Sequence, residues 1–250
     1  MSPETSNINL VRSEILRKGY YVIRKFASPE DCILLRNTVA EKIQKSPTYN
    51  LRINSNTMPD YSHKRSHDEI FRTTRYYSFY HNNYKWSDIE KKILNYGLDF
   101  RNKIENDWFQ NDSEYKVIKL NLQNYNIFTK YEETTGMLRP HRDFPKKLKF
   151  PLLQFNLILS EKDKDFKSGE FIFEDYYQKK LKIHNDLEIK IGDALLFDKY
   201  LLHSVDLTKR GITNIGRWSV LIGARAERIS SFQEKKIRLK ENLKKILYFS

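Results

Sequence analysis

Seven short runs of strand-forming residues follow one another through the second half of the chain, separated by glycine, proline, asparagine and aspartate. In the first run, residues 116–128, apolar and polar residues alternate, as they do in a strand with one buried face. Short strands with turn residues between them are typical of a β-sandwich or a β-barrel. The other runs are residues 150–160, 169–175, 179–183, 186–191, 193–197 and 217–225.

The residues before these runs predict helices. Residues 8–18 have apolar side chains at helical spacing, and Gly19 is a typical residue at a helix end. A short strand is expected at residues 20–26. Ser28 and Pro29 form a typical helix start, with the serine as cap and the proline as first helical residue.

A further helix is expected from about residue 87 to residue 108, and a basic amphipathic segment, residues 226–248, predicts a C-terminal helix. Between the helices, residues 45–86 show no clean period. Long irregular segments in compact domains are often functional, and the many aromatic residues here argue against disorder.

The chain has no internal repeat and no low-complexity linker, so we expect one α+β domain, residues 1–250, with a mainly β core. Residues 1–115 would supply helical support and a lid over the substrate. The β core would be residues 116–225, and residues 226–250 would form the C-terminal helix.

The composition and the first residues restrict the expected cellular location and partners of the protein. The single cysteine, Cys32, excludes a disulfide framework, and no stretch approaches the ~20 apolar residues of a membrane span. The first ten residues lack the pattern of a secretory signal, so we expect a soluble cytoplasmic protein. A net charge of +13 favours acidic partners, although a lysine-rich composition alone would also produce it.

Two histidines and a carboxylate are placed where they are able to share a metal ion. His141 and Asp143 are two residues apart, so on or beside a strand both side chains project from one face. His203, which follows residues 193–197, is the candidate third ligand. Such a facial set leaves coordination positions open, as in the non-haem oxygenases that bind Fe(II), 2-oxoglutarate and O₂.

An arginine on the strand after His203 supplies a second element of the site. The guanidinium of Arg217 is able to bind a carboxylate through two parallel hydrogen bonds, and Ser219 shares its strand face and would add a third. Metal ligands followed by a strand-borne arginine indicate an organic acid bound beside the metal.

Each of these residues also has an ordinary interpretation. A His-x-Asp sequence occurs by chance, His203 would fit a satisfied core histidine, and Arg217 would fit a surface ion pair. The order and spacing of all four residues favour the metal site. His63 and His67 have the spacing of zinc ligands, but no helix pattern or third ligand accompanies them. The histidines expected to be non-catalytic are His63, His67, His81 and His184.

Residues 116–225 resemble the double-stranded β-helix of 2-oxoglutarate/Fe(II) oxygenases, a jelly-roll or cupin-like barrel, and are most similar to the prolyl 4-hydroxylase-like branch. Residues 19–32 also resemble the entry strand and helix of this branch and of the phytanoyl-CoA hydroxylase group. The stretches that carry the resemblance are KYEETTGMLRPHRD (130–143), LQFNLILSEKDKDFKSGEFIFED (153–175), IGDALLFD (191–198), LLHSV (201–205) and GRWSVLIGAR (216–225).

The resemblance implies that His141, Asp143 and His203 bind iron and that Arg217 pairs with the distal carboxylate of 2-oxoglutarate. Tyr131 is placed where the family has a tyrosine that helps to bind this carboxylate; a core tyrosine is the alternative. The implied reaction is hydroxylation of an unactivated C–H bond, with 2-oxoglutarate and O₂ as co-substrates.

Two departures from the family pattern matter. Arg217 follows His203 by 14 residues, which is longer than usual in this branch and implies an enlarged turn at residues 206–216. Glu170 replaces the second glycine of a paired-glycine motif, which argues against an inherited mode of peptide binding. Neither departure affects the proposed iron ligands.

Substrate selection is expected in residues 45–86 and in the loop after His141. Arg72 or Arg75 would bind an anionic group of a small substrate, such as an amino-acid carboxylate, with Tyr77 among the tyrosines lining the pocket. Solvated surface arginines are the alternative interpretation.

The sequence is therefore compatible with three classes of function. The first is a hydroxylase of a small metabolite, an amino acid or a natural-product intermediate. The second is a hydroxylase or demethylase of protein or nucleic acid that docks through its positive charge. The third is a non-catalytic ligand-binding β-barrel, which would need neither the metal ligands nor the arginine. The sequence does not specify an oligomeric state.

Overall fold

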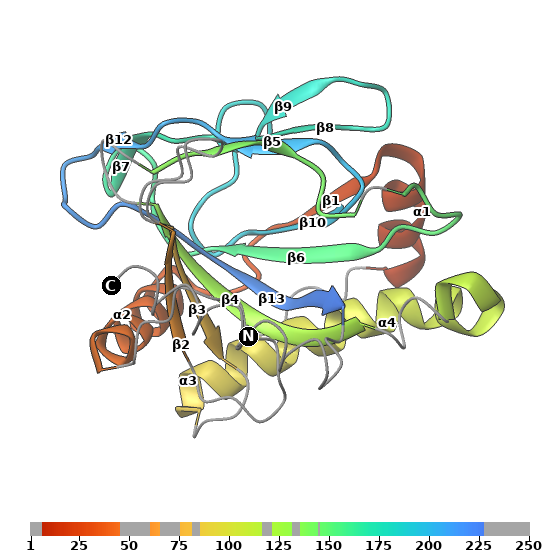
Figure 1. Cartoon of the computed structure of the whole chain (residues 1–250), viewed down its shortest axis with the longest axis horizontal. Helices are drawn as coiled ribbons and strands as arrows, with labels where there is room; N and C mark the ends of the chain where they lie inside the picture. The colour runs from red at the N-terminus through yellow and green to blue at the C-terminus, as the bar shows by residue number, and fades with distance from the viewer. Residues whose placement is uncertain are drawn as a thin grey trace, which may run out of the picture.

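The computed structural model describes residues 7–45, 61–65, 76–81, 86–116, 122–131, 136–144 and 146–227. Within them the strands form a seven-stranded sheet, a four-stranded sheet and a two-stranded pair, and all paired strands are antiparallel. Figure 1 shows the two large sheets facing each other, with helices against the outer side of the larger one. The expected mixture of helices with a mainly β core is confirmed, and the structure adds that its sheets are antiparallel.

The larger sheet has the strand order β1-β10-β6-β13-β4-β3-β2. β1 lies beside β10, and β13 lies beside β4, although the members of each pair are distant in sequence, so the sheet joins the N-terminal part of the chain to the β core. Its strands are β1 Tyr20–Ile23, β10 Ala194–Asp198, β6 Leu153–Ile158, β13 Arg217–Glu227, β4 Leu122–Tyr131, β3 Tyr76–His81 and β2 Tyr61–Arg65.

The smaller sheet has the order β5-β11-β8-β9. Its strands are β5 Leu138–His141, β11 His203–Val205, β8 Phe171–Glu174 and β9 Lys180–Lys182. Separately, β12 Lys209–Arg210 pairs with β7 Phe166–Ser168. The segment at residues 206–216, which we expected to be an enlarged turn, therefore contributes an additional strand.

The expected N-terminal helices are confirmed. Helix α1 ends at Gly19, which has a left-handed φ of 88° and donates its N–H to the carbonyl of Ile15. The hydroxyl of Ser28 accepts the N–H of Asp31 at the start of α2. One π-helical turn, Lys91–Asn95, continues α3 into α4. The helices are α1 Ile8–Lys18, α2 Pro29–Lys45, α3 Asp88–Glu90 and α4 Tyr96–Asn111.

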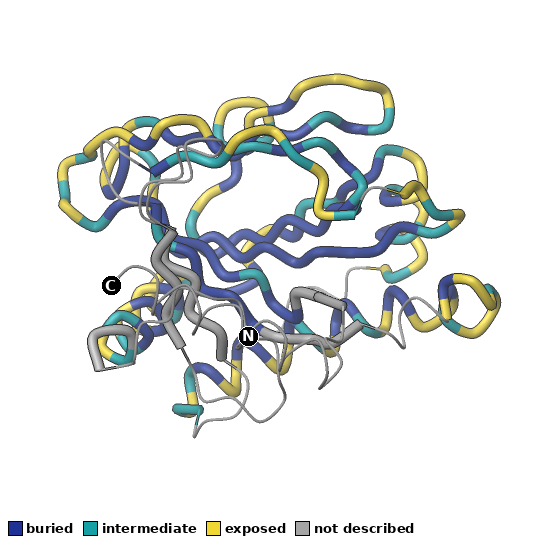
Figure 2. Tube along the Cα trace, in the orientation of Figure 1, coloured by how far each residue is buried: buried dark blue, intermediate teal, exposed yellow. Residues whose placement is uncertain are grey.

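The larger sheet is covered on both faces. Alternate residues of β6, such as Phe155 and Leu157, pack in one core cluster with Ile104 and Trp108 of α4. Ile158 of the same strand packs on the other side with Phe173 of the smaller sheet. Figure 2 accordingly shows the central strands buried along their length. Both faces of β6 are buried, although Gln154 and Asn156 alternate with its apolar residues.

Several sequence predictions of strands are corrected. Residues 186–191 form no strand, because the N–H of Asp186 bonds to the carbonyl of Lys182 and closes a turn. Residues 45–86, interpreted as irregular, contain β2 and β3, which extend the larger sheet beyond β4.

The expected element boundaries also shift. The described part of the strand predicted at residues 116–128 begins at Leu122 and continues to Tyr131. Residues 226 and 227, assigned to the C-terminal helix, belong to β13 instead. The remainder of that predicted helix lies outside the described residues.

None of the helices in the described ranges is long and apolar enough to cross a membrane.

Candidate metal and cofactor site

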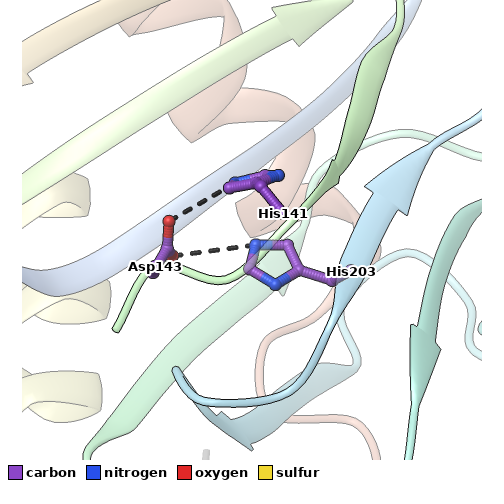
Figure 3. Close-up of side chains that lie close together, drawn as sticks. All are labelled: His141, Asp143 and His203. Carbon is purple, nitrogen blue, oxygen red and sulfur yellow. Dashed lines mark ion pairs between the residues drawn. The ribbon is translucent and has the colours of Figure 1, made fainter. Parts of the chain in front are cut away.

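The pairing of β5 with β11 places the two candidate histidine ligands opposite each other. His141 is the register partner of His203, and their ring centroids are 4.3 Å apart. Directly opposite residues of antiparallel strands point to the same side of the sheet. Figure 3 shows both imidazoles and the carboxylate of Asp143 converging on one point.

Asp143 follows the end of β5 and completes the group. Its Oδ1 lies 3.4 Å from Nε2 of His141, and its Oδ2 lies 3.7 Å from Nε2 of His203. One ligand atom from each residue lies within 4.8 Å of the others, and within the described residues this is the single such group of histidine, cysteine and acidic side chains. Ligands about 2.1 Å from one ion in adjacent positions stand about 3 Å apart, so the spacing fits a shared cation.

Backbone carbonyls orient both imidazoles. Nδ1 of His141 lies 2.9 Å from the carbonyl of Arg139, and Nδ1 of His203 lies 2.9 Å from the carbonyl of Leu201. A carbonyl only accepts, so each Nδ1 carries the proton and each Nε2 presents its lone pair towards the carboxylate. Histidine ligands of metal ions are commonly fixed in this way.

The electrostatic environment favours the metal-binding protonation states. Burial alone would raise the pKa of Asp143, but the contacts with the two histidines and the positive charge of Lys199, taken together, hold this pKa well below its usual range. Burial lowers the pKa of His203. A metal ion binds an ionised carboxylate and a neutral imidazole, and the directions of the two pKa shifts favour these states of Asp143 and His203.

Arg217 is the first residue of β13, and the ring of Phe171 contacts both its guanidinium and His203. Its backbone pairs with Tyr131, and its Cζ lies 5.3 Å from the Tyr131 ring centroid and 6.0 Å from that of Phe171. Phe171 also contacts His203, at 5.5 Å between ring centroids. The arginine and the candidate metal ligands therefore belong to one site.

The guanidinium of Arg217 is buried, and two of its nitrogen atoms make no hydrogen bond with the described residues. The residue is 2% exposed, and Nε and Nη2 have no hydrogen-bond partner among the described residues. Burial lowers its pKa. A buried cation without an anion is costly. Nε and Nη2 are adjacent N–H groups that a carboxylate is able to bind with both oxygens, which is a fit for a ligand such as 2-oxoglutarate.

The other expected cofactor-binding residues lie beside Arg217. Tyr131 is buried opposite it on β4. Ser219 is also buried, and its hydroxyl lies 2.8 Å from that of Thr129. Either hydroxyl is able to donate in that contact, so Ser219 has a bond within the sheet in addition to any bond to a ligand.

Sequence reasoning missed two polar residues of this region. Glu170 is buried 2.6 Å from Nζ of Lys162, and its carboxylate also accepts the N–H of His184. His184, expected to be a simple non-catalytic histidine, is near enough to Arg217 for that charge to lower its pKa. The pairing of β8 with β9 brings these residues together, and the glycine-motif departure at Glu170 did not reveal this contact.

The candidate substrate residues remain predictions. Arg72 and Arg75 lie outside the described residues. Tyr77 lies on β3, where its backbone pairs with Lys130, whereas Tyr131 pairs with Tyr76. Of the paired histidines with zinc-like spacing, His63 lies on β2 opposite Ser78, and His67 lies outside the described residues.

No protein-family model matches the sequence, and no curated protein matches it significantly. Similar solved structures do exist. A prolyl-4-hydroxylase of Pseudomonas putida has a TM-score of 0.57 and 13% identity, with coverage of 89% of this chain and 100% of that one. The non-heme alpha-ketoglutarate-dependent carbocyclase SnoK from nogalamycin biosynthesis has a TM-score of 0.58 and 9% identity, with coverage of 95% and 92%.

A third structure is a prolyl hydroxylase of Trichoplax adhaerens in complex with a peptide fragment of the hypoxia inducible factor oxygen degradation domain. It has a TM-score of 0.54 and 14% identity, with coverage of 85% of this chain and 86% of that one. At such identities the likeness is one of fold. The chain therefore has the fold of the 2-oxoglutarate- and Fe(II)-dependent oxygenases, and the resemblance seen in the sequence is confirmed at this level.

Proposed function

We propose that the protein is an Fe(II)- and 2-oxoglutarate-dependent oxygenase that hydroxylates an unactivated C–H bond of a small molecule. The observation that carries this proposal is the buried guanidinium of Arg217, with two unpartnered N–H groups, one phenyl ring away from His203. A non-catalytic barrel would gain nothing from burying an unpaired cation beside a metal-binding group. In this proposal the two facing sheets are the double-stranded β-helix, within one domain of residues 1–250.

Each residue of the site has a proposed role. His141, Asp143 and His203 would hold the iron through two Nε2 atoms and a carboxylate oxygen. Arg217 would pair with the distal carboxylate of 2-oxoglutarate, with Tyr131 and Ser219 beside it. The Nδ1 bonds to backbone carbonyls hold the histidine side chains in orientations in which both Nε2 atoms would face the iron.

When bound, iron with 2-oxoglutarate and O₂ supplies the oxidising chemistry, and the chain supplies position and shielding. The ring of Phe197 is 5.4 Å from that of His203, and with Phe171 it encloses the buried side of the metal-binding group. The side chain of Asp143 is 28% exposed, so the opposite side is open. We propose that the substrate reaches the site from that side. Arg72, Arg75 and Tyr77 are also proposed to contribute to its binding.

The conclusion is tested by conversion of 2-oxoglutarate to succinate in the absence of any added substrate. Wild-type protein should form succinate only with Fe(II), and His141→Ala should reduce this to background. Arg217→Met should raise the half-saturating 2-oxoglutarate concentration by about a hundredfold or more, because it removes one partner of a buried ion pair.

Arg17→Met, which removes an exposed arginine of α1, is the control and should leave both quantities unchanged. If wild-type protein neither forms succinate nor binds Fe(II) under anaerobic conditions, the non-catalytic barrel becomes the better interpretation.

A further inference from the structure

Two carboxamides on β6 face the same side as the candidate cofactor site. Leu153, Phe155 and Leu157 belong to the core cluster shared with α4, whereas Ile158 belongs to the cluster shared with the smaller sheet. Successive residues of a strand alternate between its faces. Gln154 and Asn156 therefore lie on the face with Ile158, towards the smaller sheet.

Strand register relates Gln154 to the histidine ligands through one aromatic residue. Gln154 is directly opposite Phe197 of β10, whose ring is 5.4 Å from that of His203. Asn156 is flanked by Leu195 on β10 and by Leu221 on β13. The neighbours of Asn156 on the sheet are thus apolar, and they offer no hydrogen bond from their side chains.

Both carboxamides are buried with hydrogen-bonding capacity left over. Gln154 is 4% exposed and Asn156 is 2% exposed. Oδ1 of Asn156 has no hydrogen-bond partner, and the side chain of Gln154 makes no hydrogen bond either, as far as the described residues are concerned. Buried polar groups are normally paired, and an unpaired one weakens the fold.

A buried asparagine elsewhere in the same sheet shows the usual behaviour. Asn126 of β4 is 5% exposed, and its Oδ1 accepts the backbone N–H of Gly223 at 2.8 Å. Asn126 therefore stabilises the irregularity in the pairing of β4 with β13. Asn156 has no such structural task.

The unpaired Oδ1 of Asn156 requires a donor. The dianion of 2-oxoglutarate has oxygen acceptors and no N–H or O–H group, so it does not satisfy this atom. An organic substrate with an N–H or O–H group does.

We propose that Gln154 and Asn156 bind the organic substrate through its N–H or O–H groups, which makes the substrate an amide, an amine or an alcohol. This inference rests on the proposed oxygenase function, because it assigns the ligand of that site. It adds two specificity residues on the larger sheet to the proposed substrate-binding residues Arg72 and Arg75. A substrate without hydrogen-bond donors would leave both carboxamides unpaired and would bind poorly.

The first test is thermal unfolding of the ligand-free protein. Asn156→Leu keeps a similar volume and removes the unpaired carboxamide, so Tm should stay the same or rise. Asn126→Leu, the matched control, breaks a buried hydrogen bond and should lower Tm by about 3 °C or more. A comparable loss of Tm in Asn156→Leu would show a structural role and would overturn the proposal.

The second test uses ¹⁵N-labelled protein and two small probes, acetamide and N,N-dimethylacetamide. The side-chain amide signals are assigned by their absence in Asn156→Leu and Gln154→Leu. Acetamide, which has N–H donors, should shift both signals, and the donor-free N,N-dimethylacetamide at equal concentration should not. Equal shifts with both probes, or no shift with acetamide, would overturn the proposal.

Addition of 2-oxoglutarate alone is the third arm of this experiment. If it shifts the Asn156 signal as acetamide does, the carboxamides bind the co-substrate, and the assignment to the substrate is wrong. Anaerobic Fe(II) binding is measured separately on the same protein. Its absence would remove the proposed function, while the response of the carboxamides to acetamide would be judged independently of it.

Discussion

His184, in the turn after β9, lies in an environment that favours the neutral imidazole. Its Nδ1 lies 2.7 Å from the carbonyl of Ile189, and its Nε2 is buried without a hydrogen-bond partner among the described residues. Burial, followed by the positive charge of Arg217, lowers its pKa from 6.5 to about 4, although the nearby Glu170 acts in the opposite direction. A proton on His184 would therefore stand close to the arginine proposed to bind the co-substrate.

This environment predicts a pH dependence of stability. Between pH 6.5 and about 4 the unfolded chain binds a proton at His184 that the folded chain does not. The free energy of unfolding should therefore be highest above that range and should fall as the pH is lowered through it, by up to about 3 kcal/mol for this residue. Urea unfolding at a series of pH values measures the loss.

His184→Gln removes the titrating group and should make the decline in this range shallower than in the wild type. Identical pH profiles of wild type and variant would contradict the prediction and would indicate that His184 is accessible to solvent in the folded protein.

Among the elements, α2 is tied to the β core by a buried ion pair. Nη1 of Arg36 lies 2.9 Å from Asp165, with side chains 7% and 4% exposed. The same guanidinium donates to the carbonyl of Leu159. The carboxylate also accepts the N–H of Glu161 and the hydroxyl of Thr213. One pair thus holds a helix and two connections of the β core together.

We predict that Arg36→Met lowers the free energy of unfolding by about 3 kcal/mol, because it leaves the carboxylate of Asp165 buried without its cation. Chemical unfolding measures the change. Arg17→Met breaks an exposed pair with Glu14 on α1 and should have little effect, since water replaces such contacts. A similar small effect of both variants would mean that α2 is held by its apolar contacts alone.

At the scale of the whole molecule, the net charge of +13 raises the question of which of two classes of substrate the protein binds. An enzyme that docks on nucleic acid through such a charge loses affinity steeply with salt, because bound cations are released. Turnover of a small substrate inside a barrel depends much less on ionic strength, since buried contacts are weakly screened. The surface charge by itself is compatible with both classes.

Because we propose a small substrate, we predict that substrate-stimulated consumption of 2-oxoglutarate changes less than about twofold between about 50 and about 200 mM salt. The rate is measured directly at each concentration. Stimulation by duplex DNA or RNA that falls by about a thousandfold over this range would instead establish the macromolecular substrate.

Helix ends and the spacing of the first two ligands were predictable from the sequence. Gly19 and Ser28 act through hydrogen bonds to residues a few positions away, and such local geometry does not depend on the rest of the fold. His141 and Asp143 likewise lie close together because they are two residues apart. The strands β6, β8 and β10 were predictable because short runs rich in apolar residues between turn residues are typical of buried strands.

Strand pairing was not predictable to the same degree. Residues 186–191 have the alternation of a strand, but local hydrogen bonds close a turn there. The segment containing β2 and β3 has no clean period, and pairing with β4 makes these residues strands. The stabilisation of a strand by pairing comes from residues distant in the chain, so the composition of a short sequence window does not predict it.

The sequence by itself determined the residue types of the site and their order along the chain, because the chemistry of histidine, aspartate and arginine belongs to each residue. Tertiary structure decided that His203 lies opposite His141, that Arg217 shares the ring of Phe171 with His203, and which polar groups were buried without partners. The physical reason is that contacts and burial between remote segments arise only when two sheets pack face to face, and a hydrogen bond left unmade is a property of the packed molecule.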